Sequence, residues 1–328
     1  MYQPLPLGTV LRSRYKVIDL IGRGGMGAIY LTKDLRLEGR QCAVKEVILQ
    51  PIFDASTQAQ ARAQFHREAS VLARLDHPNL PKVSDYFSEE GRDYLVMDYV
   101  PGEDLRQVIR RAREGGHFLE ERQVLAWTEQ ICDALEYLHS QDQPVLHRDI
   151  KPANLKLTPE GRIKLVDFGL VKLLAPDESR TVTILQGRGT VQYTPLEQYG
   201  GDMGHTDVRS DIYSLGATLY HLLTNQPPLD AKQRFLHPGT LAAPRELNPS
   251  LSPTTERAVL SALAMHPDQR PASVAEFRKQ LHRPLISSLS ELALHEEEWR
   301  AALQANIVPL SVAGTLTLIA VLLTLFGP

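Results

Sequence analysis

Cysteine is scarce in this chain of 328 residues, and charge of either sign is not in excess. The two cysteines, Cys42 and Cys132, lie far apart with no Cys/His spacing typical of a zinc site, which argues against a disulfide framework and favours a reducing compartment. The formal net charge of -3 gives no general attraction for nucleic acid, so we expect no nucleic-acid partner. The first residues, MYQPLPLG, lack a basic stretch followed by an apolar run, so we expect no secretory signal.

Charge is absent from one long stretch near the C-terminus, residues 307–326 (IVPLSVAGTLTLIAVLLTLF). As a helix, this stretch is long enough to cross a hydrocarbon core of about 30 Å. A buried core helix is the alternative, but core helices of this length seldom lack a polar face. We therefore predict a transmembrane helix over residues 307–326, with a helical juxtamembrane stalk over residues 284–306.

The rest of the chain changes character near residue 100. Residues 11–100 contain short β-type runs punctuated by glycine, with one helical stretch near 56–75. From about residue 104 to 283, apolar residues recur at helical spacing. The sequence predicts an α+β fold with an N-terminal extension (1–14), a β-rich first lobe (about 15–97) and a helical second lobe (about 101–283).

A glycine-rich string follows the first of these β-type runs. Its residues are Ile21, Gly22, Arg23, Gly24, Gly25, Met26, Gly27 and, after one alanine, Ile29. Glycines at these spacings let the backbone amides of a hairpin approach phosphate oxygens where a Cβ would clash. A dinucleotide-binding fold would need a helix at the third glycine, but residues 28–31 (AIYL) continue as a strand. The string alone leaves an ordinary glycine-rich hairpin open.

Two charged residues beyond this string could act together. Lys45 ends the apolar run CAVK, and a lysine there could reach the α- and β-phosphates of a nucleotide if a carboxylate fixed its direction. Glu68, in the helical stretch near 56–75, is the candidate partner. Taken singly, Lys45 could be a snorkelling surface lysine, and a helix glutamate such as Glu68 is more often a solvated charge.

The strongest signal is the string HRDIKPAN at residues 147–154, followed by DFG at residues 167–169. Phosphoryl transfer needs a carboxylate near the attacking hydroxyl, metal ligands that bridge phosphates, and a positive charge near the moving phosphoryl group. Asp149, Lys151, Asn154 and Asp167 supply these groups. We therefore expect a phosphotransferase site here.

With these motifs, the chain closely resembles the eukaryotic-type (Hanks-type) serine/threonine protein kinases, of the bacterial membrane-anchored kind. The resemblance implies a two-lobed kinase fold over residues 15–283, with ATP and Mg²⁺ as cofactors and Mn²⁺ as the alternative metal. It implies that Asp149 orients the substrate hydroxyl and that Lys151 contacts the γ-phosphate. Asn154 and Asp167 would hold the metal, and Lys45 paired with Glu68 would hold the α- and β-phosphates.

The same resemblance extends to the adenine pocket and to supporting residues. Met97 would be the gatekeeper, backbone groups of Asp98 and Val100 would face adenine, and Asp104 would contact ribose. Ile21 or Ile29 and Ala43 would form the roof over adenine. The residues implied as structural support are Arg148, Thr190, Glu197, Asp211 and Arg270, with Arg270 paired to Glu197 and Asp211 bonded to the catalytic loop. His147 would be structural.

Two positions depart from the family pattern. Where the family has Ala-Pro-Glu, this chain has PLE at residues 195–197, which keeps the glutamate and moves the proline. Lys156 falls where the family places an apolar side chain under adenine. Its stem could cover the ring while its ammonium snorkels outward, so we expect an altered nucleotide affinity.

Regulation and location follow as expectations. Thr181 and Thr183, in a segment rich in hydroxyls, are the candidates for autophosphorylation, because a phosphate near Arg148 could order the loop. We expect a single-pass protein of the cell membrane with its kinase domain in the cytoplasm. Kinases of this family often activate in trans, which leaves a homodimer open. Two alternatives are a pseudokinase-like scaffold and a small-molecule kinase, but the retained Lys45, Asp149 and Asp167 disfavour the first, and Lys151 and Thr190 favour a protein substrate.

Overall fold

The computed structural model describes residues 3–24, 27–47, 55–167, 191–199 and 206–282. The chain divides into two compact units, residues 1–281 and 282–328, and the fold below is that of the first. The predicted stalk (284–306) and transmembrane helix (307–326) lie outside the described residues. Within the described ranges, no helix combines the length and the apolar character needed to cross a bilayer.

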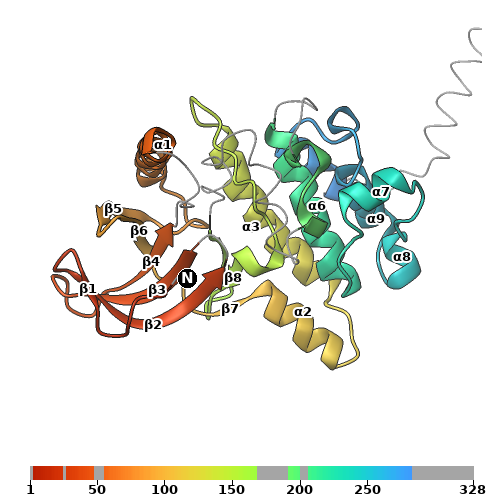
Figure 1. Cartoon of the computed structure of the whole chain (residues 1–328). Helices are drawn as coiled ribbons and strands as arrows, with labels where there is room; N and C mark the ends of the chain where they lie inside the picture. The colour runs from red at the N-terminus through yellow and green to blue at the C-terminus, as the bar shows by residue number, and fades with distance from the viewer. Residues whose placement is uncertain (1–2, 25–26, 48–54, 168–190, 200–205, 283–328) are drawn as a thin grey trace, which may run out of the picture. The chain divides into compact units, whose positions relative to one another are not determined.

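The first lobe is an antiparallel six-stranded sheet, seen in red and orange in Figure 1. Its strands, in spatial order, are β1 (Val10–Leu11), β2 (Tyr15–Gly24), β3 (Gly27–Asp34), β4 (Gln41–Val47), β6 (Arg92–Asp98) and β5 (Val83–Glu89). Helix α1 (Ala55–Arg74) packs against β5. Phe65, Ala69 and Leu72 form its buried stripe, since their spacing of four and three residues places them on one helix face.

The two faces of this sheet bury different sets of side chains. Along β4, Cys42 and Val44 belong to a cluster on one face, whereas Ala43 belongs to the main core cluster on the other. Register partners share a face in an antiparallel pair, so Met97, opposite Ala43, lies on that second face too. We call it the inner face, because its core cluster continues into the second lobe.

The residues predicted as an N-terminal extension are part of this lobe. Val10 and Leu11 pair with Lys16 and Tyr15 as strand β1. Leu5 packs against the apolar clusters outside the inner face, and its backbone amide donates to the Tyr30 hydroxyl at 2.9 Å. Residues 3–14 therefore complete the sheet.

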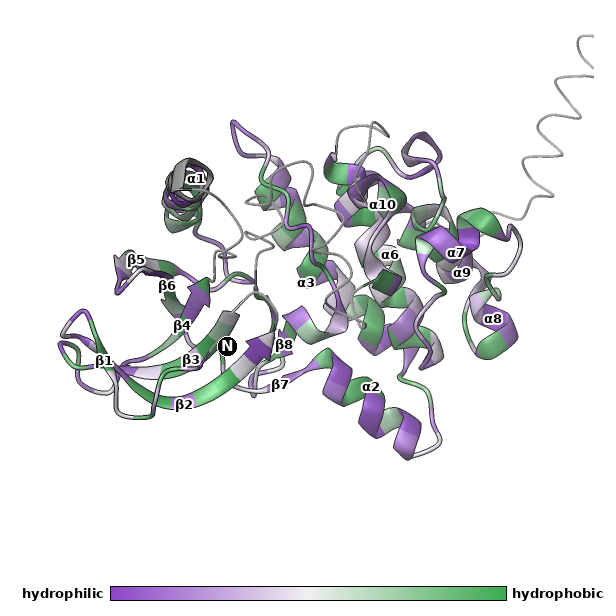
Figure 2. Ribbon diagram, viewed as in Figure 1, coloured by the Kyte–Doolittle hydropathy of each residue, from purple (hydrophilic) through white to green (hydrophobic). Residues whose placement is uncertain are grey.

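The second lobe is helical, as expected, and is built around α6 (Val208–Thr224), almost all of whose side chains are buried. Gly216 allows this, because a Cβ there would lie 2.7 Å from the Ala262 Cβ of α9 (Pro253–Ala262). The other helices are α2 (Leu105–Glu114), α3 (Glu121–His139), α7 (Ala231–Leu236), α8 (Pro244–Leu247) and α10 (Val274–His282). Figure 2 shows α2 banded in both hydropathy colours, as expected of a helix with one buried face.

A small second sheet carries two of the predicted site residues, Asp104 and Lys156. Its strands are β7 (Glu103–Asp104), β8 (Leu155–Leu157) and β9 (Ile163–Leu165), all antiparallel. A 3-10 turn, η1 (Pro152–Asn154), leads directly into β8. Two further turns, η3 (Val191–Tyr193) and η4 (Leu196–Gln198), precede α6, and η5 (Pro267–Gln269) precedes α10.

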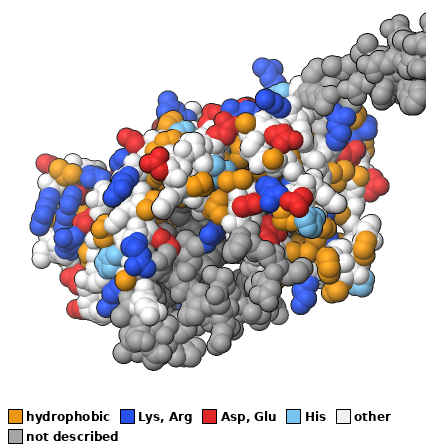
Figure 3. Space-filling model, turned by 90° about the horizontal axis from the view of Figure 1, so that it is seen from above, with side chains coloured by type: hydrophobic (Ala, Val, Ile, Leu, Met, Phe, Trp, Pro, Cys, Tyr) orange, Lys and Arg blue, Asp and Glu red, His pale blue; other side chains and the backbone are white. Residues whose placement is uncertain are grey.

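Figure 3 shows acidic and basic side chains interspersed over the described part of the face in view.

Candidate active site

Two predicted site residues on the loop before β8 donate hydrogen bonds to a third, Asp149. The Lys151 ammonium donates to Asp149 Oδ2 at 2.8 Å, and the Asn154 side-chain amide donates to the same oxygen at 2.9 Å. That amide also donates to the Asp149 backbone carbonyl at 2.7 Å. The Asp149 and Lys151 side chains are only 14% and 19% exposed, so the carboxylate and ammonium are fixed in position beside each other.

Asp211, at the start of α6, anchors this loop through hydrogen bonds to its backbone. Its carboxylate accepts hydrogen bonds from the backbone amides of His147 and Arg148, at 2.9 and 2.8 Å. His139 Nε2 lies 2.9 Å from the same carboxylate. Burial raises the pKa of Asp211, but the interactions with its neighbours, first His139 and then His147 and the Arg148 amide, outweigh burial, so the pKa lies below its ordinary value. The anchor also fixes Arg148 at φ +64°, a left-handed conformation that is unfavourable for arginine.

His147 is fully buried beneath the loop. Burial lowers its pKa from the ordinary value because the charged imidazolium is poorly solvated there. A neutral ring with no solvent access suits a packing role, as the family resemblance implies for this residue.

The β4 lysine and the aspartate of the DFG string are in contact. Lys45 Nζ bonds to Asp167 Oδ1, and the two side chains are 12% and 29% exposed. Asp167 itself has φ +65°. Glu68 lies half-buried on α1, and its predicted pairing with Lys45 stays a prediction.

The backbone brings the two predicted metal ligands to one place. The Val166 amide, next to Asp167, donates to the Asn154 carbonyl at 2.9 Å, so the end of β9 is fixed to the turn that holds Asn154. Because the Asn154 amide nitrogen donates to Asp149, the side-chain oxygen is the atom left for a cation. Amide and carboxylate oxygens suit Mg²⁺, which usually takes only one or two protein ligands beside substrate phosphates. Among the described residues, no group of three or more His, Cys, Asp or Glu side chains could hold a metal alone.

The predicted adenine roof and the phosphate-binding lysine share the inner face of the sheet. Ile29 is the register partner of Lys45, and Ala43 is that of Met97. Since Ala43 and Lys45 are two residues apart on one strand, all four side chains lie on this face. Ile21, the other roof candidate, is 42% exposed in β2.

The glycine-rich string forms the ends of β2 and β3, with Gly25 and Met26 outside the described residues. Arg23 is opposite Ala28, and Gly24 is opposite Gly27. Gly27 has φ +142°, and a Cβ there would lie 1.9 Å from the Glu46 carbonyl oxygen. At Gly24 a Cβ would meet nothing within 4 Å. The hairpin therefore needs glycine at 27 for its own geometry, while Gly24 leaves open space of the kind a phosphate could use.

The segment that joins the lobes carries the remaining predicted contacts. The Asp98 backbone amide donates to the Lys82 carbonyl at 2.9 Å, so this amide is already paired within the protein. Val100 is buried. Asp104 caps α2, accepting from the Gln107 amide at 2.9 Å. The Lys156 ammonium donates to the Gly102 carbonyl at 2.6 Å, in an exposed hydrogen bond.

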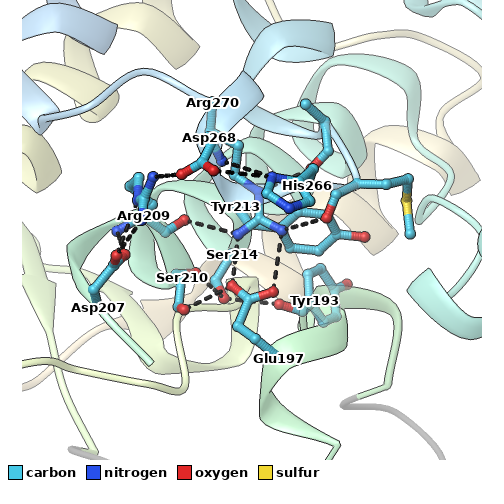
Figure 4. A network of polar contacts seen from close by, with 12 residues as sticks. Tyr193, Glu197, Asp207, Arg209, Ser210, Tyr213, Ser214, His266, Asp268 and Arg270 are labelled. Carbon is cyan, nitrogen blue, oxygen red and sulfur yellow. Dashed lines mark hydrogen bonds and ion pairs between the residues drawn. The ribbon is translucent and has the colours of Figure 1, made fainter. Parts of the chain in front are cut away.

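The predicted partners Glu197 and Arg270 form a buried, two-pronged ion pair, shown in Figure 4. Arg270 donates to the two Glu197 carboxylate oxygens at 2.6 and 3.1 Å. The Ser210 hydroxyl adds a third bond to Glu197, and the Tyr213 ring lies 4.9 Å from the guanidinium carbon of Arg270. This network fixes residues 195–197, where the proline is shifted relative to the family pattern, to α6 and η5. The ion pair of Glu197 with Arg270 is therefore formed despite the shift. Thr181, Thr183 and Thr190 lie outside the described residues.

Sequence reasoning missed two histidines near this site. His139 contacts Asp211 across 72 residues, and no local pattern marks it. His221 Nδ1 lies 2.6 Å from the Tyr193 hydroxyl, and burial, aided by the charge of Arg113, lowers the His221 pKa to about 4. Because His221 is neutral at pH 7, Tyr193 can donate this bond and η3 is pinned to α6.

The comparisons with known proteins agree with this geometry. The protein kinase domain family matches residues 15–283. A probable serine/threonine-protein kinase of Streptomyces coelicolor is 38% identical over 288 residues, which is 85% of this chain and 40% of that protein. Serine/threonine-protein kinase PknB of Mycobacterium tuberculosis is 33% identical over 286 residues, 83% of this chain and 43% of that protein. The chain thus spans less than half the length of these relatives.

Solved structures show the same fold. The apo form of PpkA-294 has a TM-score of 0.71 at 26% identity, covering 85% of this chain and 99% of that one. The PknI kinase domain of Mycobacterium tuberculosis has a TM-score of 0.65 at 29% identity, covering 85% and 98%. The β-rich and helical lobes described above are therefore those of a two-lobed protein kinase fold.

Proposed function

Because the chain belongs to the protein kinase family, we propose that it transfers the γ-phosphoryl group of Mg-ATP to serine or threonine hydroxyls of proteins. The observation that carries the proposal is the hydrogen-bonded set of Asp149, Lys151 and Asn154, held from below by Asp211. A carboxylate, a cation and an amide oxygen in fixed positions are the groups that phosphoryl transfer requires.

Each residue then has one task. Asp149 accepts the proton of the substrate hydroxyl, or orients that hydroxyl for attack. Lys151, bonded to the same carboxylate, places its positive charge where the transferred phosphoryl gains negative charge. Lys45 lies beside Asp167 at the inner face of the sheet, where it binds phosphate oxygens. Mg-ATP, when bound, supplies the phosphoryl group and a metal that neutralises phosphate charge.

Several residues of this chain would hold the nucleotide and its metal. The side chains of Asn154 and Asp167 would hold Mg²⁺, with Mn²⁺ as the alternative. Met97, Ala43 and Ile29 on the inner face pack against adenine, as their register supports. The open space at Gly24 lets backbone amides approach phosphate.

Residues 307–326 anchor the protein in the cell membrane with the kinase domain in the cytoplasm, since ATP and Mg²⁺ are used there. Autophosphorylation at Thr181 or Thr183, within a homodimer, activates the kinase by giving Arg148 a phosphate partner. Phosphopeptide mass spectrometry of active protein tests this, and two unmodified threonines would exclude it.

The proposed reaction is tested by comparing acceptors. Wild-type protein with radiolabelled ATP and Mg²⁺ should label a generic protein such as casein or myelin basic protein, and should not label aminoglycosides or choline. Lys45→Met and Lys151→Met should each lower protein labelling by about 10²-fold or more. Labelling of the small molecules alone would instead support a small-molecule kinase, and unchanged binding of nucleotide with no labelling of any acceptor would support a scaffold.

A further inference from the structure

Lys156 is the one motif position that departs from the family pattern inside the nucleotide site, and its surroundings are well defined. It lies on β8, where its register partner on β7 is Asp104. Register partners in an antiparallel pair share a face, so the Lys156 and Asp104 side chains lie on the same side of the small sheet. Leu155, the preceding residue, is fully buried in the core of the second lobe on the other side.

The ammonium of Lys156 is held at the end of the segment that joins the lobes. It donates to the Gly102 carbonyl at 2.6 Å, two residues before Asp104. Gly102 has φ +103°, and a Cβ there would lie 2.1 Å from the Leu157 carbonyl oxygen, so β8 and this segment touch backbone to backbone. This close contact fixes β8 against the segment whose Gly102 carbonyl accepts from the Lys156 ammonium, two residues before Asp104.

The two side chains are complementary in hydrogen bonding. The Asp104 carboxylate can only accept, and its side chain is 14% exposed. Its Oδ1 accepts from the Gln107 amide at 2.9 Å, and its Oδ2 accepts from the largely exposed Arg106 guanidinium at 3.4 Å. A carboxylate oxygen has a second lone pair, so each oxygen can still accept another hydrogen bond. The Lys156 ammonium can only donate, and the bond to Gly102 uses one of its three N–H groups. A ribose hydroxyl is both a donor and an acceptor, so it can bond to both side chains at once.

We propose that Lys156 donates a hydrogen bond to a ribose hydroxyl of the bound nucleotide, beside Asp104, and thereby makes the kinase selective for ribonucleotides over deoxyribonucleotides. The inference rests on the proposed function, because it assigns a specificity-determining residue to that nucleotide site. Polar groups that lose their partner when a hydroxyl is missing discriminate strongly against the analogue lacking it.

The test is calorimetric binding of Mg-ADP, 2′-deoxyADP and 3′-deoxyADP, which needs no catalysis. Wild-type protein should bind ADP at least about tenfold more tightly than one of the deoxy analogues. Lys156→Met, which keeps the stem and removes every donor, should reduce that ratio by at least about threefold, mainly through weaker ADP binding. Lys156→Leu should behave in the same way, and the thermal unfolding midpoints of both variants show that they are folded.

Lys164→Met is the matched control. Lys164 is the register partner of Lys156 on β9, but its ammonium lies 3.3 Å from the Leu80 carbonyl instead. Its substitution should leave unchanged the affinity ratios of ADP to 2′-deoxyADP and of ADP to 3′-deoxyADP. If Lys156→Met and Lys156→Leu weaken the binding of ADP and of the deoxy analogues equally, or change the binding of neither, the proposal is wrong. Lys156 would then serve only to hydrogen-bond the Gly102 carbonyl. A wild-type protein that binds none of the three nucleotides would overturn the proposed function as well.

Discussion

Arg270 donates to both carboxylate oxygens of Glu197 from a position where its own side chain is 0% exposed and that of Glu197 is 4% exposed. The remaining guanidinium donors reach the backbone carbonyls of Ala264, Met265 and Arg209. The pair therefore joins three separate parts of the second lobe: η4, the start of α6 and the turn before α10.

Removing one member of this pair should be costly. Glu197→Gln leaves a buried guanidinium without its counter-charge, and we expect it to lower the free energy of unfolding by about 3–5 kcal/mol. Urea unfolding at pH 7 measures this. Glu114→Gln is the control, because Glu114 and Arg110 form an exposed i,i+4 pair 3.9 Å apart, for which we expect a change below about 0.5 kcal/mol. Equal costs for the two variants would contradict the role assigned to the buried pair.

Asp211 should matter for turnover more than for nucleotide binding. Asp211→Asn replaces one acceptor oxygen by a donor that faces the amides of His147 and Arg148, so the catalytic loop loses a bond and its position. We expect a kcat about tenfold or more below that of wild type, a nearly unchanged KM for ATP, and a loss of about 2–4 kcal/mol in unfolding free energy. Steady-state kinetics and urea unfolding give the three values. A wild-type kcat in a destabilised variant would show that the loop does not depend on Asp211.

The two described glycines at the tip of the hairpin should respond differently to alanine. Gly27→Ala puts a Cβ against the Glu46 carbonyl at a positive φ, so the hairpin must shift and Mg-ATP binding should weaken by about tenfold or more. Gly24→Ala meets no protein atom, so its thermal unfolding midpoint should equal that of wild type. Thermal unfolding and calorimetric nucleotide binding compare the two. An unaltered Gly27→Ala protein would rule out the close approach to Glu46.

His221 should contribute to acid sensitivity. The unfolded chain takes up a proton at an ordinary pKa of 6.5, whereas burial lowers the folded pKa to about 4, so the unfolded state binds more protons between these values and stability falls as pH decreases through this window. Between pH 7 and 5 this single group should cost about 2 kcal/mol. His221→Gln cannot titrate, so its stability should fall less than that of wild type over the same range, as urea unfolding at both pH values will show. Parallel losses in the two proteins would mean that His221 does not titrate as described.

The local motifs predicted much of the site, because catalytic loops place their residues within a few positions of one another. Asp149, Lys151 and Asn154 lie within six residues and bond directly, and the two-lobed fold followed from the same motifs. Ala43, Lys45 and Met97 lie on one face of the sheet, but this follows from the register of β4 and β6 and was not predicted from the sequence.

Contacts between distant segments were not predictable in this way. His139 and Tyr193 gain their partners only when α3 and η3 pack on α6, and no local spacing encodes that packing. In the sequence, the residues before β2 look like an extension, because β1 is only two residues long and gives no clear strand pattern. Its pairing with β2 becomes visible only in the folded sheet. Lys156 shows the same limit, since the strand periodicity gives its face but not the Gly102 carbonyl that its ammonium reaches.

The most direct test of the proposed kinase activity is phosphoryl transfer from γ-labelled ATP by wild-type protein and by Asp149→Asn, at equal nucleotide saturation. Asp149→Asn keeps the size of the side chain and removes the carboxylate that would take the proton. We predict label on serine or threonine of the acceptor protein with wild type, no transfer from α-labelled ATP, and a rate lower by about 10²–10⁴-fold in the variant. Transfer at the wild-type rate by Asp149→Asn, or no transfer by folded wild-type protein that binds Mg-ATP, would contradict the account.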